Sequence, residues 1–318
     1  MKTQTDCGSA GISFSRITRF AGVALALAAG LAPAMGFAET LRWKLKAGEV
    51  LKYTLEEKMN STIKIQDRDV KSTKAQTINL TWTVKSVSAA GDADVTARIN
   101  RVRMKVNQPP FQAFDFDSDS DKVDAPEPFG AVAKQVKAMA GAEFTFQMKA
   151  SGAVENFKIP AETIKKLRDG LPADGGGAQD GLTEQALTDM LKQSSPPAFP
   201  DEEIKPGKTW AGKPSRMPSP LGVIVVDKSF TFQGPDPKNP AILQVDTETK
   251  VGLEPGDNTG YSAKVRSQQG KGRLDFNSES GRIAATTLTQ KMELMIAGPM
   301  DQNIDQTTET TSTMTLTP

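Results

Sequence analysis

The sequence predicts a mainly β protein of the α+β class, built as two curved antiparallel sheet halves joined by a short helical connector. Three observations predict this fold. Long stretches of the 318-residue chain alternate apolar with polar side chains, which is the period of a half-buried strand. Gly and Asp residues interrupt these stretches as turns would. Helical spacing of apolar residues is concentrated near 129–140 and in the segment 160–200.

The first half begins with three long strands between residues 48 and 107. Residues 48–65 alternate around Leu51, Tyr53 and Leu55. Residues 78–84 then alternate strictly, and the turn at 90–92 leads into the third strand. One extra residue between Ile99 and Val102 shifts the phase of that strand, which predicts a β-bulge.

The rest of the first half combines a helix with a hairpin. Apolar residues at three- and four-residue spacing predict a helix over 129–140. Residues 144–148 then alternate as a strand, and Ser151-Gly152 turns the chain into a partner strand over 154–157.

The connector and the second half follow. Residues 161–168 and 183–193 are predicted helices, separated by a Gly-rich spacer at 174–180 and closed by Pro196-Pro197. The predicted strands of the second half are 222–232, 241–251, 262–269, 272–276, 283–296 and 304–316. The run of Thr residues over 307–317 is interpreted as a terminal strand with one wet face, or alternatively as an edge for protein contacts.

Short matches between the two halves suggest a duplication. Lys205 to Trp210 matches Lys46 to Tyr53 as a basic residue and a Gly that open a strand reaching an aromatic. Phe276 with Gly281 matches Phe146 with Gly152 as a strand followed by a turn. The predicted organisation is therefore a 39–159 half, a 160–200 connector and a 201–318 half.

The first 38 residues read as a signal peptide. Arg16 and Arg19 precede an uncharged apolar stretch over 20–31, which is too short for the roughly 20 residues that a membrane-spanning helix needs. Small residues place cleavage after Ala38, or after Ala34; an uncleaved anchor is the alternative. We expect an exported protein, periplasmic or extracellular, without a transmembrane segment after cleavage.

Composition excludes several functional classes. The chain has no His, and its one Cys, Cys7, falls in the signal peptide, so His-dependent and Cys-dependent catalysis and thiolate metal sites are excluded. A net charge of +1 argues against nucleic acid as a partner. Glycine-rich phosphate loops do not follow any predicted strand. We therefore expect no cofactor and no enzymatic activity.

The acidic run of Asp115, Asp117, Asp119 and Asp121 is the sharpest local cluster. Carboxylates spaced by two offer oxygen ligands of the kind that Ca²⁺ prefers. The Gly and Glu that a calcium loop needs are missing at the required positions, so a solvated acidic loop after a Phe-lined strand is the main interpretation, with a calcium site as the alternative.

A binding role has better support than catalysis. Two curved sheets with a helical connector can enclose a concave surface, and methionines would give it an adaptable apolar lining, although each of them could equally be ordinary core. The candidate residues are Met104, Met139, Met148, Met190, Met292 and Met295.

Several short motifs carry a family resemblance. These are Phe116-Asp117-Ser118 before a helix, the hairpin with Phe146 and Gly152, Pro206 to Trp210, and the hairpin from Phe276 to Gly281. With them the chain resembles an uncharacterised family of exported, internally duplicated β-rich bacterial proteins. The architecture is also similar to that of lipoprotein and lipid carriers of the bacterial envelope, although fold alone is a weak guide to function.

The expected function is a non-enzymatic exported binding or carrier protein whose partner is a lipid or another apolar ligand. The alternatives are a structural or interaction module that binds an envelope protein, and a hydrolase that uses two carboxylates.

Overall fold

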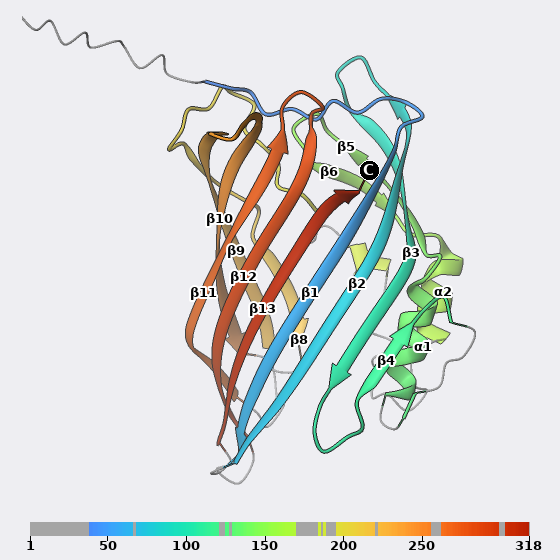
Figure 1. Cartoon of the computed structure of the whole chain (residues 1–318), viewed down its shortest axis with the longest axis vertical. Coiled ribbons are helices and arrows are strands. Elements are labelled where there is room, and N and C mark those ends of the chain that lie inside the picture. The colour runs from blue at the N-terminus through green and yellow to red at the C-terminus, as the bar shows by residue number, and fades with distance from the viewer. Residues whose placement is uncertain are drawn as a thin grey trace, which may run out of the picture. The chain divides into compact units, whose positions relative to one another are not determined.

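The computed structural model describes residues 38–65, 68–120, 125–126, 129–169, 184–185, 187–188, 195–219, 222–255, 262–298 and 303–317. Their strands form one antiparallel sheet of 13 strands, accompanied by two helices (Figure 1). The strand order is β6-β5-β3-β2-β1-β13-β12-β11-β10-β9-β7, with β4 paired to β3 and β8 paired to β9. The sheet is open, because this order ends at β6 and β7 and does not return on itself.

The elements have the following bounds. The first part of the chain contains β1 (Val50–Ile65), β2 (Arg68–Val87), β3 (Ala93–Asn107), β4 (Phe114–Asp117), α1 (Gly130–Met139), β5 (Glu143–Met148), β6 (Val154–Lys158) and α2 (Ala161–Asp169). The second part contains β7 (Thr209–Ala211), β8 (Ser215–Ser219), β9 (Gly222–Asp236), β10 (Asn239–Pro255), β11 (Ser262–Asn277), β12 (Arg282–Ala297) and β13 (Asn303–Thr317). The mainly β, antiparallel fold class is confirmed.

The two faces of the sheet differ in chemistry. We call the face that carries Trp82 the inner face and the opposite one the outer face. Along the ladders, Trp82 lies opposite Leu51 and Ala97, all three buried. The outer face is mostly Thr, Lys and acidic side chains, such as Thr311, which pairs with Lys58 and Thr289. Side chains alternate between faces along a strand, which explains the two-residue period of the sequence.

The predicted bulge in β3 is confirmed. Asn79 pairs with Arg101 and Leu80 pairs with Ile99, so that Asn100 has no opposite residue on β2. The extra residue restores the phase of the strand, because Val102 then faces inward with Ile99.

The predicted break between 269 and 272 is wrong, because β11 runs unbroken from Ser262 to Asn277. Gly270 lies in the predicted break, and Gly272 begins the next predicted strand. They serve close packing instead: a Cβ on Gly270 would lie 2.8 Å from the Cβ of Thr249, and one on Gly272 would overlap the backbone of Thr287. Glycine in a strand interior often marks such a close approach.

The core has two parts on the inner face. The larger cluster includes Trp43, Tyr53, Trp82, Phe232 and Phe276 and lies at one end of the sheet. The smaller cluster lies where α1 packs on β3 and β4, as predicted for a helix over 129–140, and includes Val102, Met104, Phe114, Phe116, Phe129, Ala133 and Val136. Together they leave the other end of the inner face to half-buried side chains.

The two halves of the sequence meet edge to edge. β1 pairs with β13 over fourteen residue pairs, from Lys52 with Thr317 to Ile65 with Ile304. Because β13 is also paired with β12, the Thr run is an interior strand, and the alternative of an exposed protein-contact edge is wrong. The duplication and the proposed domain boundaries stay predictions.

Several predictions concern residues outside the described ones. The signal peptide, Cys7 and the 174–180 spacer are among them. In the predicted helix over 183–193, the described residues 184–185 and 187–188 are helical, and Leu187 is buried. Among the described helices, none is long and apolar enough to cross a membrane.

Candidate functional site

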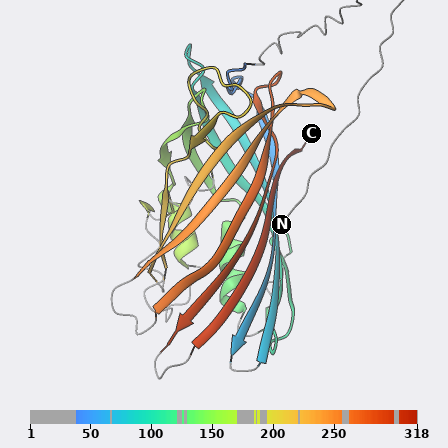
Figure 2. The ribbon, with the colours of Figure 1, turned by 90° about the vertical axis from the view of Figure 1, so that its left-hand side faces the viewer.

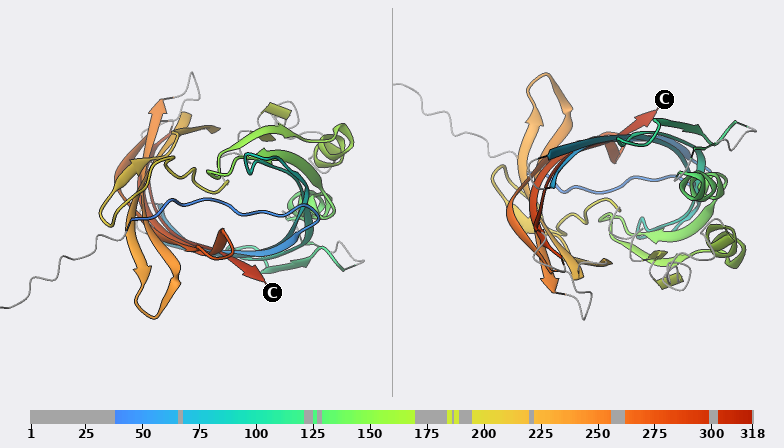
Figure 3. Two further views of the ribbon diagram at one scale, coloured as in Figure 1. Left: turned by 90° about the horizontal axis from the view of Figure 1, so that it is seen from above. Right: turned by 90° about the horizontal axis from the view of Figure 1, so that it is seen from below.

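One end of the inner face is closed by residues 38–49, which we call the N-terminal strap. Seen end-on, the sheet curls into an open ring and the strap, in blue, crosses it (Figure 3). Trp43 N–H donates to the carbonyl of Ala150 at 2.8 Å, and Lys44 N–H donates to the carbonyl of Gly281 at 2.9 Å. The strap therefore ties the β5–β6 turn to the β11–β12 turn.

The strap seals this end with alternating apolar side chains. Leu41, Trp43 and Leu45 are buried, and the Trp43 ring lies 6.2 Å from the rings of both Trp82 and Phe276. The sequence analysis began its first strand at residue 48 and missed this segment. The alternation of Leu41, Trp43 and Leu45 with charged residues was the signal that could have revealed it.

Polar side chains occupy the middle of the inner face, and we call them the polar belt. The ladders place one seven-strand row across it: Lys74, Met59, Thr310, Gln290, Gly270, Thr249 and Lys228. Flanking rows add Gln76, Glu57 and Ser312 on one side and Ser72, Ser61, Thr308 and Gln268 on the other. A run of polar groups on a concave sheet face is unusual for a dry core.

On the β1–β2 side, the polar groups of the belt satisfy one another. Lys74 Nζ lies 3.0 Å from the Glu57 carboxylate, which forms an ion pair within the face. Gln306 Nε2 donates to the hydroxyl of Ser61 at 3.3 Å, and Ser61 contacts the hydroxyl of Thr308 at 3.5 Å.

On the β9–β11 side, two polar atoms of the belt are buried without a hydrogen-bond partner in the described part of the chain. Thr249 is 4% exposed, and neither its hydroxyl nor the Gln268 Oε1 has a hydrogen-bond partner among the described residues. Lys228 lies directly opposite Thr249, and burial lowers the pKa of its ammonium group. We call Lys228, Thr249 and Gln268 the β9–β11 cluster.

Beyond the belt the inner face becomes apolar again, and we call this end the apolar rim. Two residues further along the strands lie Gln306 and the apolar residues Val70, Ile63, Leu294, Val265, Leu253 and Ile224. The last row contains the exposed Arg68 and the apolar residues Ile304, Ile296 and Ala263. These apolar residues are all half-buried, and none of them packs in either core cluster. Figure 2 shows the sheet from the side of β10 and β11.

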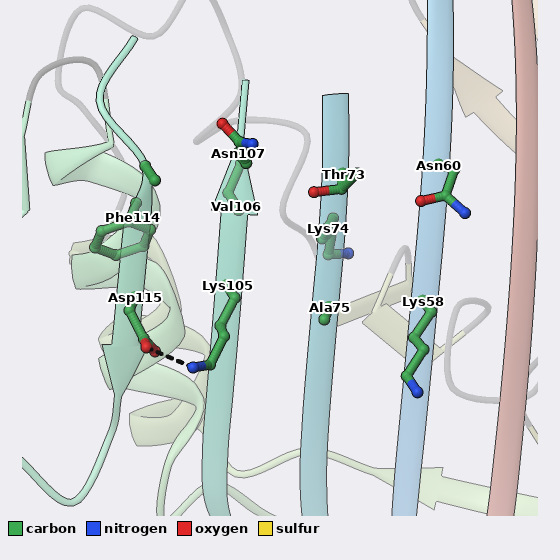
Figure 4. Close-up of a pocket in the computed structure, with 11 residues that line it drawn as sticks. Lys58, Asn60, Thr73, Lys74, Ala75, Lys105, Val106, Asn107, Phe114 and Asp115 are labelled. Carbon is green, nitrogen blue, oxygen red and sulfur yellow. Dashed lines mark ion pairs between the residues drawn. The ribbon is translucent and has the colours of Figure 1, made fainter. Parts of the chain in front are cut away.

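The outer face carries a separate open groove. It has a volume of about 490 Å³ and lies over β1 to β4 (Figure 4). The ladders align Lys58, Ala75, Lys105 and Asp115 across it, and the Lys105 Nζ lies 2.7 Å from the Asp115 carboxylate. These are exposed lysines on a wet surface, and Lys105 is already paired.

The acidic run is neutralised by basic side chains of β3. Arg101 donates to both oxygens of Asp117, which holds the pKa of that carboxyl well below its usual range, and also pairs with Asp119 at 3.1 Å. Among the described residues, no group of three or more acidic side chains gathers as a metal site would require. Asp121 lies outside the described residues, and the calcium site stays a prediction.

The methionines predicted to line a concave surface lie in different parts of the structure. Met104 and Met148 are buried in the core, and Met139 packs at the edge of the α1 cluster. Met292 lies on the inner face opposite Thr308. Met295 faces outward, and its sulfur accepts a hydrogen bond of 3.0 Å from the Arg266 guanidinium. Met190 is outside the described residues.

Comparisons with known proteins assign this chain to a family, but they identify no activity. No curated protein matches the chain. A lipovitellin structure, described by its lipid–protein interactions, shares 9% identity with a TM-score of 0.46; the match covers 86% of this chain but only 25% of lipovitellin. DynF from the dynemicin biosynthesis pathway of Micromonospora chersina shares 8% identity, covering 89% and 86% of the two chains, with a TM-score of 0.23. The translocator domain of the autotransporter NalP from Neisseria meningitidis shares 6% identity, covering 85% and 89%, with a TM-score of 0.21.

A family model provides the firmer result. It matches residues 90–283, which spans most of the described strands and both helices. The family has no assigned function, as the sequence motifs led us to expect. This chain belongs to the family of unknown function DUF6263.

Proposed function

We propose that this protein is a non-enzymatic carrier that holds an amphipathic lipid against the inner face of its sheet. The observation that carries the proposal is the apolar rim next to the polar belt. Half-buried apolar side chains in one continuous area are costly in water, and burying such surface stabilises a complex by about 25 cal/mol per Å². A lipid has the matching division into a polar head and an apolar chain.

The dimensions of the face suit an acyl chain. On β2, the row of Lys74 lies six residues from the last row at Arg68, which at the usual strand rise of about 3.3 Å per residue is roughly 20 Å. One leaflet of a bilayer fills about 15 Å, half of the roughly 30 Å hydrocarbon core. A single chain laid from belt to rim would therefore remain in contact with the face along its length.

The N-terminal 38 residues support a place outside the cytoplasm. Their basic residues, short apolar stretch and small residues before residue 39 are typical of a cleaved secretory signal. We therefore place the carrier in the bacterial envelope, where lipids must be shielded from water during transport. The hydrolase alternative draws no support from the inner face, since Glu57 is the acidic residue of the described rows there and is paired with Lys74.

The first test is chemical. The full chain is produced in cells and purified without detergent, then an organic extract and the intact protein are analysed by mass spectrometry. We expect a lipid in the extract and a mass that lacks the first 38 residues. Recovery of a lipid-free protein that also shows no saturable binding of the fluorescent probe N-phenyl-1-naphthylamine would overturn the carrier proposal.

The second test locates the site. Leu294→Asp places a charge on the apolar rim, and Thr289→Asp places the same charge on the outer face of the same strand β12. We expect the rim variant to bind the probe at least about ten-fold more weakly, and the outer variant to bind as the parent does. Leu294→Ser serves as a milder variant, and circular dichroism checks that each protein is folded. Equal binding by all variants would contradict a site on the inner face.

A further inference from the structure

We infer that the ion pair of Glu57 and Lys74 is the headgroup site of the carrier, and that it selects lipids with a zwitterionic headgroup, which has one ammonium and one phosphate. This inference rests on the proposed carrier function and specifies its ligand class. It is carried by two opposite charges that contact each other on the inner face and are partly exposed there.

Both charged side chains lie on the concave face of the sheet. The alternation that places Trp82 on the inner face of β2 also places Lys74 there. Glu57 lies on the inner face of β1 opposite Gln76, and its carboxylate is 3.0 Å from the Lys74 Nζ. The side chain of Glu57 is 40% exposed and that of Lys74 is 30% exposed, so a ligand on the inner face can reach both charges.

Stability alone does not account for this ion pair. A partly exposed ion pair contributes little to the free energy of unfolding, and replacing a more buried one by apolar side chains is often neutral or stabilising. The same two strands do use apolar residues next to the pair, because Leu55 lies opposite Ile78 two residues closer to the large core cluster. We therefore assign the pair a role in binding.

The charges on this side of the inner face are balanced. In the described inner rows of β1, β2, β13 and β12, Glu57 and Lys74 are the ionisable side chains between the large core cluster and the last row, where Arg68 lies. Lys228 lies on the distant strand β9 and has an interaction of its own. A lipid with a net charge would be attracted by one member of the pair and repelled by the other. A zwitterionic headgroup can bring its phosphate to Lys74 and its ammonium to Glu57, so that each charge lies beside an opposite one.

Hydroxyl groups beside the ion pair suit the uncharged part of such a lipid. Ser312 lies opposite Glu57 and Thr310 lies opposite Met59, and both hydroxyl-bearing residues are half-buried on the inner face of β13. A hydroxyl can donate to a phosphate or ester oxygen and can accept from an ammonium. These side chains can therefore bind either charged group of the headgroup or the ester that joins it to the acyl chain.

Apolar side chains lead from the ion pair to the apolar rim. On β1, Met59 lies next to the pair, in the row of Lys74, and Ile63 lies in the first row of the rim. On β12, Met292 and Leu294 follow the same direction at a two-residue step. A lipid with its headgroup at the pair would thus place its acyl chain against the rim.

The experiment measures displacement of N-phenyl-1-naphthylamine by four ligands with the same acyl or alkenyl chain, each below the concentration at which it aggregates. They are oleoyl lysophosphatidylethanolamine, monoolein, oleate and oleylamine, whose headgroups at about pH 8 are zwitterionic, uncharged, anionic and cationic. We expect the zwitterionic lipid to bind about ten-fold tighter than each of the other three, as charge-assisted hydrogen bonds allow.

Variants assign this preference to the ion pair. Glu57→Gln leaves Lys74 without its partner, so this variant should lose the zwitterionic preference and bind oleate about ten-fold tighter than the parent does. Lys74→Gln leaves Glu57 without its partner and should gain affinity for oleylamine in the same way. A gain of affinity cannot come from a protein that has failed to fold, and circular dichroism checks each variant.

The matched control is the ion pair of Lys105 and Asp115, which lies on the outer face with its charged atoms 2.7 Å apart (Figure 4). Asp115→Asn and Lys105→Gln remove the same two charges from that pair and should leave all four affinities unchanged. If they shift the preference as the inner-face variants do, the effect is one of overall charge and the headgroup inference is wrong.

The remaining outcomes separate the two proposals. If the zwitterionic lipid does not bind tightest, or if Glu57→Gln keeps the parent's preference, the headgroup inference is wrong and the carrier proposal stands. If no ligand displaces the probe from the folded parent, the carrier proposal fails as well.

Discussion

The N-terminal strap provides the sharpest stability prediction. Trp43 is 3% exposed, so Trp43→Ala removes nearly a whole indole from the core. About 200 Å² of apolar surface at about 25 cal/mol per Å² corresponds to roughly 5 kcal/mol, part of which alanine retains. Together with the cavity that remains, we expect the free energy of unfolding to fall by about 3–5 kcal/mol.

Urea unfolding followed by circular dichroism measures this loss. Lys46→Ala, a truncation of an exposed residue in the same strap, is the matched control and should stay within about 0.5 kcal/mol of the parent. Trp43→Phe should cost less than Trp43→Ala, because it keeps an aromatic ring and removes an indole N–H that has no hydrogen-bond partner among the residues that the structure describes. A loss below about 1 kcal/mol for Trp43→Ala would refute the view that the strap seals the core.

Three further changes test other parts of the sheet. Gly272→Ala should lower the free energy of unfolding by about 2–3 kcal/mol in urea melts, because its Cβ would overlap the backbone of β12. The pKa of Asp117 is lowered by Arg101, so this carboxylate stabilises the fold above its unfolded pKa, and that contribution is lost as pH falls through the lowered native pKa. Asp117→Asn should therefore flatten the decline of the urea midpoint between about pH 5 and about pH 2. Glu49→Ala should cost about 2–3 kcal/mol by thermal melting, since it leaves the largely buried Arg282 without its ion-pair partner, and an unchanged melting temperature would contradict this.

Local pattern predicted most elements of the fold. The strands around Leu51 and Trp82 and the bulge at Asn100 were predicted correctly. Their signals, alternation and a phase shift, depend only on neighbouring residues along the chain. The break between residues 269 and 272 was predicted wrongly because Gly occurs both in turns and at close strand contacts, and only the neighbouring strands distinguish the two.

The candidate site could not be derived from the sequence because it depends on register between distant strands. Lys228, Thr249 and Gln268 are separated by 19 or more residues and show no motif. Only the pairing of β9, β10 and β11 brings them to one face. The pairing of β1 with β13 likewise joins distant parts of the chain, and the residues of neither strand predict it.

The place of β13 has a consequence for how the protein reaches its native state. The last strand of the sheet in sequence order is inserted between the first strand and β12, so residues more than 250 positions apart must pair before the sheet is continuous. Such high contact order slows folding, because the loop entropy is lost before the contacts form. Until β13 is in place, β1 and β12 each expose a long unpaired edge, which attracts other chains. A factor that shields these edges during folding would therefore raise the yield of native protein more than a faster turn or a stronger helix would.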